Sequence, residues 1–146
     1  MRITIKAIVE FKNRILLLRD KNNNYDLPGG GVETRETLEQ ACIRELLEET
    51  SYKNFKIQKL LPSNYNYYVM KNPELKSNMS CYIVQLINLE KGTSVEKNTS
   101  EEWIYVTDLL SKFETKNTPR HIAMKNCIKD YLKQKTTNEL VFLLRK

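Results

Sequence analysis

The chain has 146 residues, of which 40% are hydrophobic and 29% are charged, and its formal net charge is +6. These proportions are ordinary for a soluble globular protein, and the length suits one domain, expected to span residues 1–146. Hydropathy excludes a transmembrane helix of roughly 20 apolar residues, and residues 1–6 alternate like a strand rather than a signal peptide. We therefore expect a cytoplasmic protein without membrane association.

The cysteines and the positive charge point to no special chemistry. Cys42, Cys81 and Cys127 are odd in number and far apart, without the spacing of a metal site, so reduced thiols fit best. A net positive charge favours anionic partners such as nucleotides or RNA ends. The lysines are scattered, however, and no aromatic-and-basic strip of a nucleic-acid-binding module stands out.

The first thirty residues predict strands that lead into a glycine loop. Alternating apolar residues at positions 3, 5, 7 and 9 predict a first strand, residues 15–18 a buried second strand, and residues 25–27 a short third one. The segment Leu27-Pro28-Gly29-Gly30-Gly31 is expected to continue neither a strand nor a helix, because proline fixes φ and the glycines free the backbone.

An acidic helix is predicted directly after this loop. Thr37 with Gln40 matches the capping box, and residues 38–49 contain strong helix formers without Gly or Pro. Glu45, Glu48 and Glu49 have i, i+3, i+4 spacing and share an arc of roughly 100°. Like charges so close repel, which favours a bound cation, and Mg²⁺ prefers such oxygen ligands. The alternative is a solvated helix face.

The rest of the chain predicts a mixed sheet between helices, an α/β fold. Residues 55–61, 81–89 and 103–106 are expected to be strands, with an extended hairpin or a substrate loop at 62–80. Thr118 and Pro119 begin an amphipathic helix that should run to about Gln134. The apolar tail at residues 140–144 is expected to form an added strand or a homodimer contact.

The acidic segment resembles the signature of the MutT-like Nudix hydrolases. The pattern G-x5-E-x7-R-E-U-x-E-E, in which U is aliphatic, is met by Gly30, Glu36, Arg44, Glu45, Leu46, Glu48 and Glu49. The resemblance implies a Nudix-type α/β/α sandwich with a mixed β-sheet between helices. Two positions depart from it: Ser51 stands where the family has a helix-ending glycine, and Arg35 where many members have glycine. A left-handed conformation at Ser51 would cost about 1 kcal/mol.

The resemblance also implies the roles of the site residues. Water would attack one phosphorus of a diphosphate linkage with the help of Mg²⁺, or of Mn²⁺ as the alternative. The general base would be a glutamate of the helix, or Glu101 or Glu102 ahead of the strand at Trp103. The implied catalytic residues are Glu45, Glu48, Arg44 and Glu102; the metal ligands Glu45, Glu48, Glu49 and the carbonyl of Gly29 or Gly30; the substrate-binding residues Gly29, Gly30, Gly31 and Tyr68; and the supporting residues Glu33 and Glu36.

The sequence does not decide which of several nucleotide-type molecules is the substrate. Tyr68 lies about where some dinucleoside-polyphosphate hydrolases of the family carry a tyrosine, and Tyr65, Tyr67 and Trp103 could also stack on a base. The preferred function is Mg²⁺-dependent hydrolysis of a nucleoside di- or triphosphate derivative. The alternatives are a non-catalytic nucleotide sensor on the same fold, a basic RNA-binding module, and an enzyme that removes pyrophosphate from RNA 5′ ends.

Overall fold

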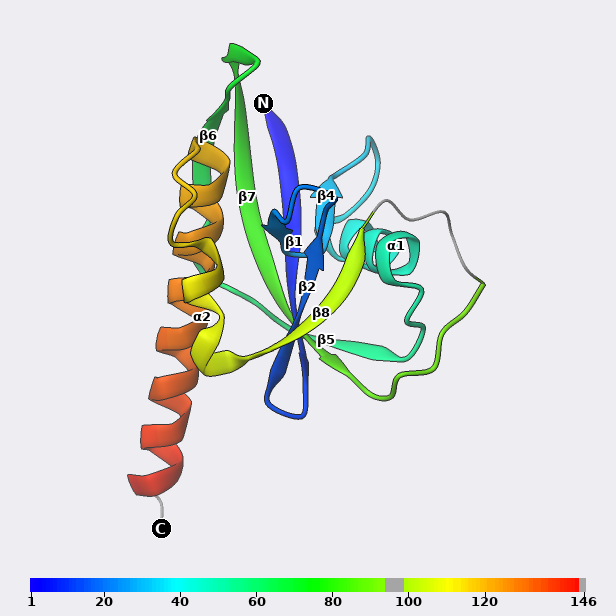
Figure 1. Cartoon of the computed structure of the whole chain (residues 1–146), viewed down its shortest axis with the longest axis vertical. Coiled ribbons are helices and arrows are strands. Elements are labelled where there is room, and N and C mark those ends of the chain that lie inside the picture. The colour runs from blue at the N-terminus through cyan, green and yellow to red at the C-terminus, as the bar shows by residue number, and fades with distance from the viewer. Residues whose placement is uncertain (94–98, 145–146) are drawn as a thin grey trace.

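The computed structural model describes residues 1–93 and 99–144, and within these ranges a mixed β-sheet lies between two α-helices (Figure 1). The elements in chain order are β1 Arg2–Phe11, β2 Arg14–Arg19, β3 Tyr25–Asp26, β4 Gly29–Gly31, α1 Leu38–Thr50, β5 Phe55–Leu60, β6 Tyr65–Val69, β7 Asn72–Leu86, β8 Ser100–Tyr105, the 3-10 helices η1 Val106–Asp108 and η2 Leu110–Phe113, and α2 Pro119–Leu144. The expected α/β fold is confirmed.

Strand β1 lies at the centre of the sheet and pairs on both sides. The order is β3-β2-β1-β7-β5, and β4, β6 and β8 pair with β1, β7 and β2 respectively. The pair β1–β7 is parallel over residues 2–10 and 77–85, whereas the other pairs are antiparallel. Both faces of β1 are buried from Thr4 to Val9, as expected for a central strand covered on both sides.

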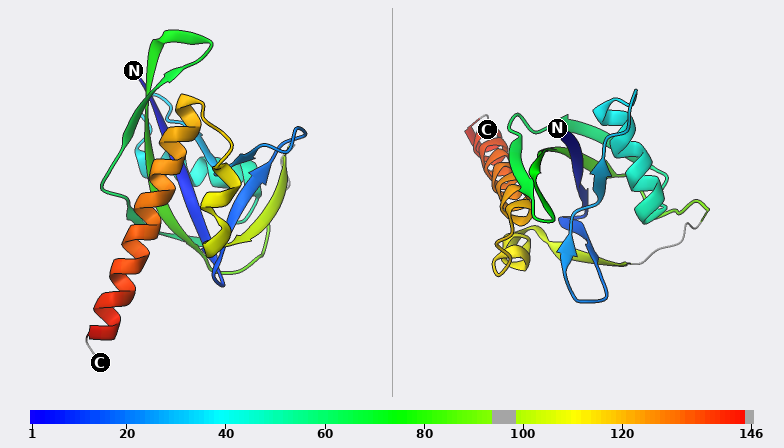
Figure 2. Two further views of the ribbon diagram at one scale, coloured as in Figure 1. Left: turned by 60° about the vertical axis from the view of Figure 1, so that its left-hand side comes forward. Right: turned by 90° about the horizontal axis from the view of Figure 1, so that it is seen from above.

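The two faces of the sheet carry separate apolar cores. The larger core joins β1, β2 and β7 to α2 and η2, with Tyr131, Phe113, Met124 and Ile8 fully buried. The smaller one packs Ala41, Cys42 and Leu46 of α1 against the opposite face. Figure 2 shows α1 and α2 on opposite sides of the strands. The implied α/β/α sandwich is therefore present.

The glycine segment forms a strand, contrary to the expectation that it could not. Gly29, Gly30 and Gly31 make up β4 and pair with Lys6, Ile5 and Thr4 of β1. A Cβ on Gly29 would lie 2.0 Å from the carbonyl oxygen of Ile5, and its φ is +137°. Only glycine can bring the backbone so close at this position.

Residues 62–80 form the expected hairpin, from β6 and the first half of β7. The end of α2 was predicted wrongly, since the helix continues to Leu144 instead of stopping near Gln134, and the tail is not a strand. The helix passes through Thr136 and Thr137, whose hydroxyls donate to the carbonyls of Leu132 and Lys133. No helix among the described residues is long and apolar enough to span a membrane.

Candidate active site

Helix α1 is fixed so that Glu45 and Glu49 face β4. The Thr37 hydroxyl accepts the N–H of Gln40 at 3.1 Å, and the Gln40 side chain accepts the N–H of Thr37 at 2.9 Å, which completes the capping box. Leu46 and its apolar neighbours bury one side of the helix against the sheet. Ser51 ends the helix in a left-handed conformation with φ 63°, as the family pattern implied for this position.

Arg44 joins the loop before α1 to the carboxylates on the helix. Its guanidinium donates to both oxygens of Glu36, at 2.7 and 2.9 Å, to the carbonyl of Gly31 at 3.0 Å, and to Glu45 at 3.0 Å. Glu33 lies 3.8 Å away and donates its backbone N–H to Glu36. The hydrogen bonds from Arg44 hold the pKa of Glu36 at about 2. This bidentate ion pair between Arg44 and Glu36 fixes the position of the loop relative to the helix.

Glu49 and Glu45 converge on the glycine strand. Oε1 of Glu49 accepts the N–H of Gly29 at 2.8 Å. Burial raises the pKa of Glu49 to about 7; the Gly29 N–H and the Lys6 charge lower it, and the neighbouring Glu45 carboxylate raises it further. A Cβ on Gly30 would lie 2.5 Å from Oε1 of Glu45. Two carboxylates therefore meet against a backbone that glycine alone leaves open.

Glu48 is placed differently from these two. It is 52% exposed, and one of its oxygens lies 3.4 Å from Nη1 of Arg44. Within the described residues no three Asp, Glu, His or Cys side chains form a ready-made metal cluster. Two carboxylates beside a backbone strand nevertheless suit Mg²⁺, which commonly takes one or two carboxylates and completes its shell with water and substrate phosphates.

A buried charge network lies beneath the glycine strand, and sequence reasoning missed it. Lys6 is 2% exposed; its ammonium group lies 3.1 Å from Asp26 and donates to the carbonyls of Leu27 and Gly29. Arg120 at the start of α2 donates to the other oxygen of Asp26 at 2.7 Å. Burial raises the pKa of Asp26, but the charges of Lys6 and Arg120 outweigh it and hold this pKa below its ordinary value. The sequence feature that could have revealed this network is Lys6, a charged residue in the middle of a strand that is buried on both faces.

A cleft of about 440 Å³ opens beside β4. Residues of the hairpin β6–β7, of the first half of β1 and of the start of α2 line it, together with Gly29, Gly30 and Asp26. A second hollow, of about 540 Å³, contains Glu49 and shares Asp26, Thr118 and Arg120 with the first. Glu49 thus lines one of two adjoining hollows, and Gly30, against which Glu45 lies, lines the other. Together they are large enough for a nucleotide-sized ligand.

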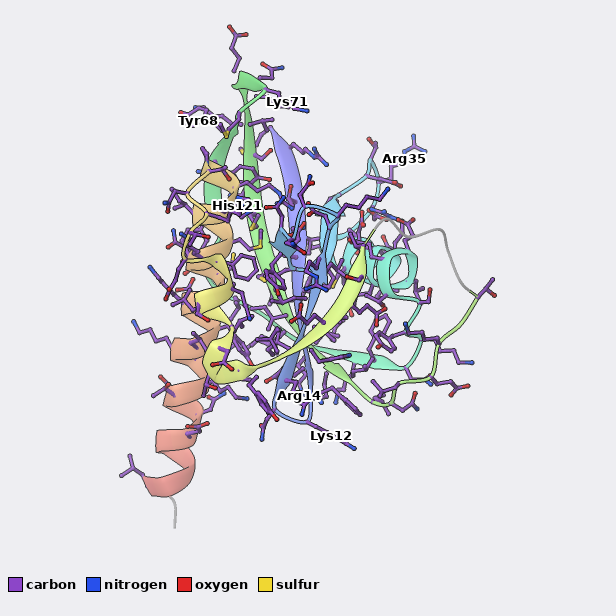
Figure 3. The ribbon with its side chains drawn as sticks, in the orientation of Figure 1. Lys12, Arg14, Arg35, Tyr68, Lys71 and His121 are labelled. Carbon is purple, nitrogen blue, oxygen red and sulfur yellow. The ribbon has the colours of Figure 1, made fainter. Side chains whose placement is uncertain are left out.

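The predicted aromatic residues divide between the cleft and the body of the protein. Tyr67 and Tyr68 line the cleft, and Tyr68 is 54% exposed (Figure 3). Trp103 instead packs between Phe11 and Tyr52, at centroid distances of 6.0 and 6.1 Å. The Tyr65 hydroxyl donates to Asp130 on α2. Trp103 and Tyr65 are therefore engaged in packing and in a contact to α2, outside the lining of this cleft.

The two candidate bases of β8 lie inside the strand, whereas the sequence placed them before it. Glu102 accepts the Tyr25 hydroxyl at 2.9 Å and lies 3.6 Å from Arg19. Glu101 accepts the Tyr52 hydroxyl at 2.8 Å and pairs with Lys91 at 2.9 Å. Each candidate base of β8 is thus already engaged with a tyrosine hydroxyl and a cation.

Comparison with known proteins agrees with this geometry. The family model described as NUDIX domain matches residues 2–126. Among solved structures, a NUDIX hydrolase from Nitrosomonas europaea superposes with a TM-score of 0.73 at 24% identity, covering 92% of this chain and 90% of that one. An Ap4A hydrolase from C. elegans gives a TM-score of 0.69 at 15% identity, covering 94% and 99%. At these identities the structural likeness shows the fold alone.

Sequence relatives match over a shorter stretch. An ADP-ribose pyrophosphatase from Methanocaldococcus jannaschii is 46% identical over 52 residues, which cover 33% of this chain and 31% of that protein. A Bacillus subtilis protein provisionally named 8-oxo-dGTP diphosphatase is 44% identical over 46 residues, 31% of each. The matched stretch spans about a third of each relative. The family match over most of the chain nevertheless shows that it belongs to the Nudix hydrolase family.

Proposed function

We propose that this protein hydrolyses a diphosphate linkage in a nucleoside di- or triphosphate derivative, with Mg²⁺ as its cofactor and Mn²⁺ as the alternative. The observation that carries the proposal is the convergence of Glu45 and Glu49 on the glycine strand beside the cleft. The relatives are named for hydrolysis of ADP-ribose and 8-oxo-dGTP, both of which contain such a linkage.

Each residue of the site has a definite task in this reaction. Glu45 and Glu49 would hold Mg²⁺, which when bound neutralises phosphate charge and lowers the pKa of the attacking water. The N–H of Gly29 orients Glu49, and Arg44 orients Glu45 through a charge-assisted hydrogen bond. Fixed carboxylates reduce the reorganisation needed when the substrate binds.

Glu48 is the favoured general base. It is half-exposed, lies about one turn after Glu45 and directly before Glu49, and contacts Arg44 at 3.4 Å. Glu102 would first have to leave Tyr25 and Arg19. Such a base can take the proton of the attacking water as its oxygen bonds to one phosphorus, while the bond from that phosphorus to the bridging oxygen breaks and the other phosphate leaves. The presence of all three helix glutamates favours an enzyme over a nucleotide sensor.

A substrate panel tests the proposal. The wild-type protein is incubated, with Mg²⁺ or with a chelator, with nucleoside triphosphates, ADP-ribose, dinucleoside polyphosphates and triphosphorylated RNA. Released phosphate is measured after inorganic pyrophosphatase, and after a phosphatase for products that carry a terminal phosphate. We expect Mg²⁺-dependent hydrolysis of at least one nucleotide. Tight nucleotide binding without hydrolysis of any member would favour the sensor instead.

A further inference from the structure

Four cationic side chains line the cleft beside β4, and they fall into two pairs. Lys6 and Arg120 are engaged with Asp26, at 3.1 and 2.7 Å. The side chains of Arg2 and Lys71 form no hydrogen bond or ion pair with any residue that the structure describes, although both residues line the cleft. The single carboxylate of Asp26 compensates one charge of the first pair, so the second pair supplies most of the cleft's uncompensated positive charge.

Arg2 lies directly against the glycine strand. Its Nη2, Nε and Cζ atoms are 3.0, 3.1 and 3.4 Å from the point where a Cβ on Gly31 would be. The carbonyl of the same glycine accepts the hydrogen bond from Arg44. The Arg2 guanidinium is therefore next to the strand on which Glu45 and Glu49 converge, and its donors remain available to a ligand.

Lys71 comes to the same end of the cleft from the hairpin. It lies at the turn between β6 and β7, and Figure 3 shows it at the end of the molecule where β1 begins. Its exposed neighbours Tyr68 and Met70 line the cleft as well. The nearby Lys76, in contrast, lies over the Tyr68 ring at 5.7 Å. Lys71 and Arg2 thus contribute two unpaired cations from separate elements.

We propose that Arg2 and Lys71 bind a phosphate of the substrate beyond the two phosphates of the cleaved linkage. The substrate class is then a nucleotide with at least three consecutive phosphates, in preference to a diphosphate flanked by two sugars. Phosphate matches the planar fork of arginine and the point charge of lysine, whereas a neutral sugar gains little from two cations. The assignment deepens the proposed function and rests on it for the identity of the cleaved linkage.

Calorimetry with two inorganic ligands tests this assignment. Tripolyphosphate and pyrophosphate are titrated in Mg²⁺ into protein that carries Glu48→Gln, which removes the favoured base and keeps both proposed metal ligands, so that no turnover disturbs the heats. Arg2→Gln and Lys71→Gln are added to this background one at a time. The matched control is Lys133→Gln, which removes the same charge from an exposed position on α2. Circular dichroism checks that each variant is folded.

We expect tripolyphosphate to bind more tightly than pyrophosphate, and Arg2→Gln and Lys71→Gln each to weaken tripolyphosphate about tenfold, as loss of a charge-assisted hydrogen bond does. Pyrophosphate affinity and the Lys133→Gln control should change by less than about twofold. Equal affinities for the two ligands, or equal losses for both, would overturn the assignment. The binding experiment needs no turnover. A wild-type protein that hydrolyses no nucleotide would therefore contradict the proposed hydrolase function, while the binding result would still decide whether Arg2 and Lys71 bind a third phosphate.

Discussion

The carboxylate of Glu49 accepts the backbone N–H of Gly29 at 2.8 Å, and this bond joins the last turn of α1 to the glycine strand. The residues are 20 positions apart in the chain, so the contact exists only in the folded protein. It aims one carboxylate along β4 toward Glu45, whose own carboxylate lies against Gly30. A cation between them would replace the repulsion of two like charges by attraction to both.

The raised pKa of Glu49 predicts how the stability of the metal-free protein depends on pH. Its pKa is about 7 in the folded protein against an ordinary 4.5, with burial as the main cause. Between these values unfolding releases a proton, so the free energy of unfolding contributed by this group falls as pH rises. Urea titrations from pH 4.5 to 7.5 should show that fall in wild type relative to Glu49→Gln.

The same comparison removes the effect of other titrating groups. Burial lowers the pKa of His121, which gives a contribution of opposite sign near pH 6.5 in both proteins. Adding Mg²⁺ above pH 7 should stabilise the wild type, since the cation binds the folded carboxylates. A wild-type profile parallel to that of Glu49→Gln would show that Glu49 has an ordinary pKa.

Gly30→Ala should disturb the metal site while leaving the fold in place. The new Cβ would lie 2.5 Å from Oε1 of Glu45, and the end of that side chain can move aside. We expect Mg²⁺ affinity, measured by calorimetry, to fall about tenfold or more, because one of two ligands is displaced. Gly31→Ala is the control, since the three atoms nearest its Cβ all belong to the Arg2 guanidinium and none to a glutamate. Unchanged Mg²⁺ affinity in Gly30→Ala would show that Glu45 is not a ligand.

Removal of the Asp26 carboxylate should destabilise the protein through Lys6. The lysine is 2% exposed, and Asp26 is its acidic partner at 3.1 Å. An unpaired buried ammonium group costs about 3–5 kcal/mol, so Asp26→Ala should lose roughly that much free energy of unfolding. Adding Lys6→Met to the same variant should recover a large part. A double variant as unstable as Asp26→Ala alone would show that the lost free energy of unfolding does not come from the unpaired charge of Lys6.

Ser51→Gly should stabilise the protein by about 1 kcal/mol. Ser51 has φ 63°, where a non-glycine residue is strained, and its hydroxyl is buried without a hydrogen-bond partner among the described residues. The change in chemical denaturation midpoint measures the effect. Arg35→Gly serves as a comparison, because Arg35 has a similar positive φ of 68° but, unlike Ser51, is exposed. A destabilised Ser51→Gly would mean that the flexibility of the unfolded chain outweighs the relief of strain.

Local patterns in the sequence were sufficient to predict α1, its capping box and the spacing of its glutamates. The course of β1 and β2 followed from the same kind of information, because one-dimensional periodicity determines which side of an element is apolar. The glycine segment was predicted wrongly, since its pairing depends on how closely β1 approaches. Thr136 and Thr137 have low helix propensity and favour an end near Gln134, but α2 continues through them to Leu144.

The contacts that complete the site join residues far apart in the chain. Lys6, Asp26 and Arg120 come together only when β1, β3 and α2 pack, and no local spacing links them. The separation of Glu48 from Glu45 and Glu49 likewise depends on where Arg44 and β4 lie. A helical wheel puts all three glutamates in one arc, but only the folded structure shows which two face the glycines.

The most direct test of the proposed chemistry is the turnover of Glu49→Gln on the best nucleotide of the panel. Wild type, Glu49→Gln and the control Glu39→Gln, an exposed glutamate in the first turn of α1, are compared at saturating substrate and Mg²⁺. We predict that Glu49→Gln loses about a hundredfold or more in kcat, as removal of a metal ligand costs several kcal/mol of transition-state stabilisation. Glu39→Gln should turn over like wild type. Wild-type turnover by folded Glu49→Gln would contradict the assignment of Glu49 as a ligand of the catalytic metal ion.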